Sequence, residues 1–276
     1  MIAATDTTQT ATQFAESIAA LPPLPSTAQQ ILTCFGDEFI DADKVTAVVE
    51  GDPGICAKLL GLSNSAYFGL AEPVNSIGEA IARVLGVDTV RSLVLAMAIQ
   101  QSFNNRNCPQ FDTERFWMQS LMAAECCKKI AVADPESGDA ARDLAYSAGL
   151  IHNLGLMALV HMEPVRTNAI LKVHAAEAEP DTLVSRFVAE FGTDHKVMTA
   201  ELARIWSLPT PMLLAYQYRA FGGASCDERL GMVVAAGVAA VENTEVDPEL
   251  RFDLRPWAEN LGLDVDDLQG FAHLNE

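Results

Sequence analysis

The most apolar stretch of the chain is Ala145–Val160, in which hydrophobic residues cover nearly every side of a helix. A helix that is apolar all round is normally buried inside its domain. Two polar residues, His152 and Asn153, lie side by side at its centre. Since buried polar groups need partners, the pattern predicts one buried central helix whose polar pair faces either a structural partner or a metal or substrate. The stretch is too short and too interrupted for a membrane span.

Shorter helices fill the rest of the chain, and residues typical of helix ends separate them. Ser26 with Gln29 and Ser76 with Glu79 have the spacing of capping boxes. The predicted helix starts are Ser26, Asp41, Asp52, Ser76, Asp88, Asp112 or Thr113, Pro180–Asp181 and Asp194, and the predicted glycine ends are Gly36, Gly86 and Gly192. No alternating strand pattern survives, so the predicted fold class is all-α, with short connections that favour antiparallel neighbours.

Four parts follow from the changes in composition along the chain. Residues 1–12 are polar and predicted to be a disordered leader. Residues 13–105 are predicted to form an N-terminal helical subdomain and residues 112–245 a second one, with the polar run around Asn104–Pro109 as linker. Residues 246–276 are an acidic C-terminal extension with a weak last helix.

The chain is strongly acidic. It has 18 basic and 37 acidic residues, which give a net charge of −19. Sequence-independent binding to nucleic acid or to anionic membranes needs basic surface, so we expect neither. The N-terminus has no basic start or apolar run, which favours a cytoplasmic location. The cysteines are predicted to be free and mostly buried; they are Cys34, Cys56, Cys108, Cys126, Cys127 and Cys226.

Two ordered sets of motifs resemble a known family. The first set is Leu21–Pro25, Gly51–Pro53 with Lys58–Leu60, Asn64–Gly69, and Ile77 with Glu79–Ile81 and Leu85–Gly86. The second set is Phe116–Trp117 with Ser120, Gly149–Gly155, Gly192 with Asp194–His195, and Trp206–Pro209. Together they are similar to the HDOD domain, a bacterial relative of the HD phosphohydrolases, over about residues 21–240. The resemblance implies a multi-helical HD-like bundle, with residues 112–245 as the HD-like half.

HD hydrolases hold one or two divalent metals with histidines and aspartates, and the metal activates water. The resemblance places the family's His-Asp doublet on His152 and Asn153, where an amide replaces the carboxylate that hard ions prefer. It places the first histidine of the scheme near Gln119, and a later histidine pair near Arg219, where no histidine is present. His152 and His195 remain as candidate nitrogen ligands.

Each candidate also has a structural reading. His152 can be a satisfied core histidine, and His195 can occupy the first turn of a helix and bond a neighbouring loop. His161 and His174 lie outside the doublet. The resemblance therefore implies a non-catalytic signalling module that binds a protein, or a small nucleotide, without a cofactor. The alternative is a phosphohydrolase or phosphodiesterase with a degenerate site for Mn, Fe or Mg, in which Arg219 holds phosphate.

Overall fold

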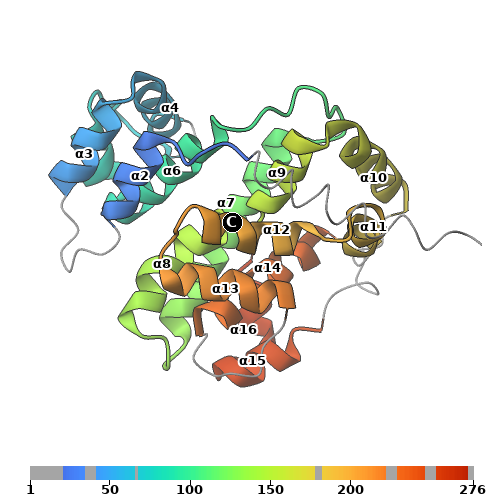
Figure 1. Ribbon diagram of the computed structural model, residues 1–276. Coiled ribbons are helices and arrows are strands. Elements are labelled where there is room, and N and C mark those ends of the chain that lie inside the picture. The colour runs from blue at the N-terminus through green and yellow to red at the C-terminus, as the bar shows by residue number, and fades with distance from the viewer. Residues whose placement is uncertain are drawn as a thin grey trace, which may run out of the picture. The chain divides into compact units, whose positions relative to one another are not determined.

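The computed structural model describes residues 21–34, 42–65, 68–177, 182–221, 229–245 and 253–272. The regular elements of these residues are all helical, which confirms the predicted all-α fold class. The chain divides into two compact units, Pro23–Ser102 and a larger one built mainly from Phe103–Glu276 (Figure 1). The predicted leader, residues 1–12, lies outside the described residues.

The smaller unit is a layer of short helices around an aliphatic core. Its elements are α2 (Ser26–Thr33), α3 (Ala42–Glu50), α4 (Pro53–Ser63), α5 (Ile77–Ala80), a π-helical turn (Ile81–Leu85) and α6 (Val87–Gln100). Buried aliphatic side chains from these helices meet at the centre of the unit, as Ile31, Ile55 and Leu95 illustrate. Leu24 is also buried and anchors the proline-rich segment before α2.

Some predicted caps of this unit are confirmed and others are wrong. Asp52 accepts hydrogen bonds from the amides of Gly54 and Ile55 and caps α4. Ser76 caps α5 by accepting from the amide of Glu79.

Two predicted caps are wrong by one or two residues. Ser26 lies inside α2, whose N-cap is Pro25 and has no side-chain cap bond. Asp88 lies in the first turn of α6, where its carboxylate pairs with the buried Arg91 at 3.1 Å. Asp41 and Gly36 lie outside the described residues.

The larger unit packs longer helices into a bundle. Its elements are α7 (Thr113–Ala133), α8 (Asp139–Leu150), α9 (Leu154–Met162), α10 (Pro164–Glu177), α11 (Thr182–Phe191), α12 (His195–Ile205), α13 (Thr210–Phe221), α14 (Arg229–Glu245), α15 (Arg255–Leu261) and α16 (Val265–Gly270). Asp112 and Asp194 cap α7 and α12 as predicted. The helices of the C-terminal extension, α15 and α16, pack on α14 (Figure 1).

The predicted single central helix is wrong, because the stretch Ala145–Val160 forms two helices. α8 ends at Leu150, α9 begins at Leu154, and the turn between them holds Ile151, His152 and Asn153. Apolar residues flank this turn on both sides, so their pattern predicted one continuous helix through the polar pair His152 and Asn153. Residues 141–162 are long and apolar enough to cross a membrane, but 89% of the span is buried inside the structure, as a core segment would be.

Glycines let the helices of the larger unit approach one another closely. A Cβ atom on Gly149 would lie 2.8 Å from the Cα of Ala124 on α7. A Cβ on Gly237 would lie 2.6 Å from the Sγ of Cys127, so the glycine- and alanine-rich helix α14 packs closely on α7. Cys126 and Cys127 are free and buried, also as predicted.

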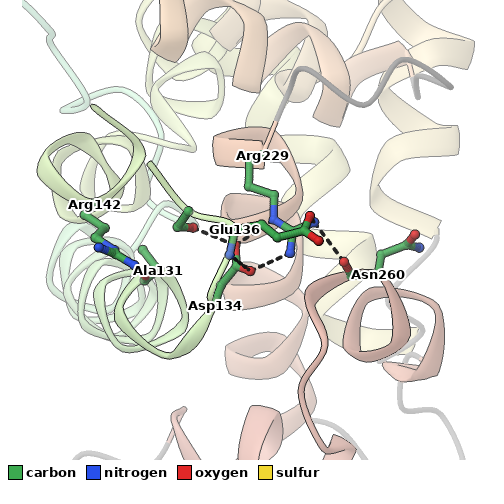
Figure 2. Close-up of polar contacts among 7 residues, drawn as sticks. Ala131, Asp134, Glu136, Arg142, Arg229 and Asn260 are labelled. Carbon is green, nitrogen blue, oxygen red and sulfur yellow. Dashed lines mark hydrogen bonds and ion pairs between the residues drawn. The ribbon is translucent and has the colours of Figure 1, made fainter. Parts of the chain in front are cut away.

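A buried ion pair joins the end of α7 to the start of α14 (Figure 2). Asp134 is fully buried and accepts two hydrogen bonds from the Arg229 guanidinium, one of them at 2.6 Å. Ser137 donates to the same carboxylate, and Arg229 also donates to the carbonyl of Asn260 at the end of α15. One guanidinium therefore ties three helix ends together.

Replacing Arg229 by Met should lower the free energy of unfolding by about 3 kcal/mol, because it leaves a buried carboxylate without its cation. The change would be measured by urea denaturation. The matched control is Arg255→Met, which breaks an exposed pair with Asp253 and should have little effect. Equal effects of the two substitutions would contradict the importance of the buried pair.

The same pair predicts a loss of stability in acid. Burial raises the pKa of Asp134, but hydrogen bonds from Arg229 and Ser137 outweigh burial and hold the pKa below its ordinary value of 3.8. The contribution of Asp134 to the free energy of unfolding is therefore present above pH 3.8, and it is lost as the pH falls through the lowered pKa.

Candidate functional site

The candidate site lies where the turn between α8 and α9 meets the first turn of α12. His152 lies in the turn and His195 is the first residue of α12, and each residue is about 5% exposed. Close contact fixes the two segments, since a Cβ on Gly155 would lie 2.0 Å from the carbonyl oxygen of His195. Thr199 strengthens this contact: its Oγ1 accepts from the Gly155 amide and donates to the His195 carbonyl, both at 2.9 Å.

Arg219, from α13, is the charged group of the site. Its Nη1 donates to the carbonyl oxygen of His152 at 2.9 Å, and only 7% of its side chain is exposed. Glu242 lies 4.0 Å from its Nη2, at the limit of an ion pair and 44% exposed. The structure therefore places a guanidinium, largely buried and weakly compensated, directly against the turn that carries His152.

Both histidines are held neutral. Burial, followed by the charge of Arg219, lowers the pKa of His152 from 6.5 to about 3. Burial and the same guanidinium lower the pKa of His195 well below 6.5, and Lys196 and His152 act in the same direction. His152 Nδ1 lies 2.7 Å from the carbonyl of Gly149. Because a carbonyl only accepts, Nδ1 carries the proton and Nε2 presents a lone pair.

Several buried polar atoms of the site have no hydrogen-bond partner. They include Oδ1 of Asn153 and Nδ1 of His195. Asn153 is the N-cap residue of α9 but makes no side-chain cap bond. The His195 ring packs against Phe187 of α11, with ring centroids 5.8 Å apart. Buried unsatisfied atoms are where water or a ligand atom binds.

The other sequence candidates lie elsewhere on the helices of the larger unit. His161 is near the end of α9, where its Nδ1 accepts from the amide of Asn104 at 2.9 Å. His174 is in the last turn of α10. Gln119 is half buried on α7, beside Trp117 and Ser120, each of which has a buried polar atom without a hydrogen-bond partner. Within the described residues, no three His, Cys, Asp or Glu side chains are grouped so that they could hold a metal ion.

Two residues of the site had no sequence signal for their roles. Thr199 bridges the two segments from within α12, and its bond to Gly155 spans 44 positions. Tyr216 of α13 donates to the carbonyl of Ala148 at 3.0 Å and anchors the end of α8, 68 positions away. Such contacts depend on how the helices pack, so spacing along the chain does not reveal them.

Gly155→Ala should be strongly destabilising, by roughly 3 kcal/mol, because its methyl group would overlap the backbone of α12 and force the helices apart. Thermal or urea unfolding measures the effect. Gly61→Ala is the matched control, since a Cβ there meets nothing within 4 Å, and alanine in a helix should stabilise by up to about 1 kcal/mol. Tolerance of both substitutions would rule out the close approach.

Neutral histidines in the folded state predict a pH dependence. The lowered pKa of His152 means that its contribution is complete above pH 6.5 and is lost as the pH falls toward about 3. Between pH 7 and pH 5 the loss is about 2 kcal/mol for this residue, from 1.36 kcal/mol for each pH unit. His152→Gln should lose correspondingly less stability over this range in urea denaturation. Parallel losses in the two proteins would show that His152 titrates alike when folded and unfolded.

Comparisons with known proteins agree with this architecture. Residues 21–220 match the HDOD domain family. An uncharacterised protein of Treponema pallidum is 27% identical over 212 residues, which are 76% of this chain and 39% of that protein. The chain therefore spans well under half the length of that relative.

Two solved structures share the fold. A candidate signal transduction protein of Marinobacter aquaeolei has a TM-score of 0.80 at 22% identity, over 96% of this chain and 62% of that one. A candidate phosphohydrolase of Shewanella amazonensis has a TM-score of 0.69 at 24% identity, over 94% and 91% of the two chains. The two neighbours share the overall fold of this chain, and the family match covers most of it. The chain belongs to the HDOD domain family.

Proposed function

We propose that this HDOD chain is a non-catalytic signal-transduction module that works by binding another protein, or a small nucleotide. The observation that carries the proposal is the buried guanidinium of Arg219 beside two neutral histidines. A cation supplied by the protein itself lies next to the residues that match the metal-binding doublet of HD hydrolases. The similarity to a candidate signal transduction protein supports the same role.

The donor set does not fit a divalent metal. Such an ion prefers carboxylate oxygens, whereas His152, His195 and Asn153 offer only neutral donors and Gln119 supplies another amide. Repulsion between two unit charges 4 Å apart is about 4 kcal/mol at an effective dielectric constant of 20, and a divalent ion doubles it. The charge of Arg219 therefore opposes metal binding at these residues.

The alternative function is a metal-dependent phosphohydrolase or phosphodiesterase with an unusual ligand set. The partnerless atoms Asn153 Oδ1 and His195 Nδ1 favour it, because a ligand would satisfy them. The similarity to a candidate phosphohydrolase also favours it. In this case His152 and His195 would bind the ion, and Arg219 would hold phosphate. One observation argues against this function: the Nη1 of Arg219 already donates to the carbonyl oxygen of His152.

Metal content and turnover separate the two functions. The protein is purified without chelator, incubated with Mn²⁺, Fe²⁺ or Mg²⁺, desalted and measured by elemental analysis. We expect below about a tenth of an equivalent of metal, since a working site would hold its ion through several ligands. We also expect no hydrolysis of bis(p-nitrophenyl) phosphate above that of His152→Ala.

The His152→Ala variant is the control for both measurements, and circular dichroism establishes that it is folded. One or two equivalents of metal, retained by the wild type and lost in folded His152→Ala together with phosphodiesterase turnover, would overturn the non-catalytic proposal in favour of the hydrolase.

A further inference from the structure

The chain crosses from one unit to the other at residues 22–23 and again at residues 102–103, and we call these two crossings the passages. The residue on the larger unit's side of each passage is Pro22 or Phe103. Trp206 Nε1 donates to the carbonyl of Pro22 at 3.2 Å, and the Trp206 ring lies 6.0 Å from that of Phe103. The Phe103 ring also meets His161 edge-on at 5.8 Å, and the amide of Asn104 donates to His161 Nδ1. We call Pro22, Phe103, Asn104, His161 and Trp206 the passage clamp.

The clamp and the candidate site lie at opposite ends of the same two helices. His161 is in the last turn of α9 and Trp206 directly follows α12. At the other ends, Gly155 of α9 contacts His195, where α12 begins. Both helices therefore begin near the site and end near the clamp. Gly155 and His161 are six residues apart on α9, which corresponds to about 9 Å at 1.5 Å per residue.

The two helices are tightly joined at the site end. The backbone of α9 touches the backbone of α12 at Gly155, without space for a methyl group. The Thr199 hydroxyl bridges the Gly155 amide and the His195 carbonyl. Close-packed interiors are nearly incompressible and transmit strain, so α9 and α12 cannot shift independently at this end. A displacement of the α8–α9 turn or of the start of α12 would therefore move both His161 and Trp206.

We propose that α9 and α12 act as one coupled pair that transmits a change at the His152–His195 site to the clamp on the two passages between the units. This inference rests on the proposed signalling role. It adds the helices through which binding at the site would change the segments that join the two units. The coupling is a free energy between site and clamp, and it acts in both directions.

Hydrogen exchange of the full chain tests the coupling. The readout is a peptide spanning residues 103–111, whose Asn104 and Gln110 amides donate to His161 and to Asn168. Thr199→Val keeps the side-chain shape but removes the bridging hydroxyl, whereas Thr199→Ser retains the hydroxyl. We expect the exchange of this peptide to rise at least about threefold in Thr199→Val and to stay near wild type in Thr199→Ser. His195→Leu should raise it as well.

The control for a general loss of stability is Leu268→Ala, a buried truncation on α16, which packs on α14 and α15. It should lower the unfolding temperature without selectively speeding exchange at residues 103–111. The proposal is overturned if Leu268→Ala speeds exchange there as much as Thr199→Val does, or if Thr199→Val and Thr199→Ser are alike. Metal binding or turnover would refute the non-catalytic function while leaving this readout unaffected, so the two failures are distinguishable.

Discussion

The hydrogen bond from Arg219 to the carbonyl of His152 places a permanent positive charge inside the larger unit, and the rest of the site depends on it. With burial, this charge keeps His152 and His195 neutral. A neutral imidazole can pack against Phe187 and bond a backbone carbonyl, whereas an imidazolium beside a guanidinium would be strongly repelled. The chain thus places a cation of its own beside His152 and Asn153.

In the proposed signalling role, the site works through the packing of the helices around this charge. Gly149 and Gly155 draw the turn between α8 and α9 against α7 and α12. Thr199 and Tyr216 then fix the same turn by hydrogen bonds. A rigid, closely packed centre of this kind is suited to pass small displacements onward, and α9 and α12 lead from it to the segments that join the units.

The sequence predicted what depends on neighbours along the chain. The caps Asp52, Asp112 and Asp194 are correct because capping needs only a short polar side chain and the two or three amides that follow it. Ser26 and Asp88 were misassigned because Pro25 and Gly86, which have no capping side chain, occupy the N-cap positions. The break at His152 was missed because its neighbours are as apolar as a helix core. Arg219 was singled out as a phosphate ligand, but its bond to His152 spans 67 positions and follows from packing alone.

The protonation state of His152 and His195 in the folded protein is the most direct test of this account, and ¹⁵N NMR of the two rings measures it. The account predicts that both rings remain neutral from pH 7 to pH 5, with the proton of His152 on Nδ1, as its bond to the carbonyl of Gly149 requires. Titration of either ring with a midpoint near 6.5, the ordinary value for histidine, would contradict it, because a cation then forms readily beside Arg219.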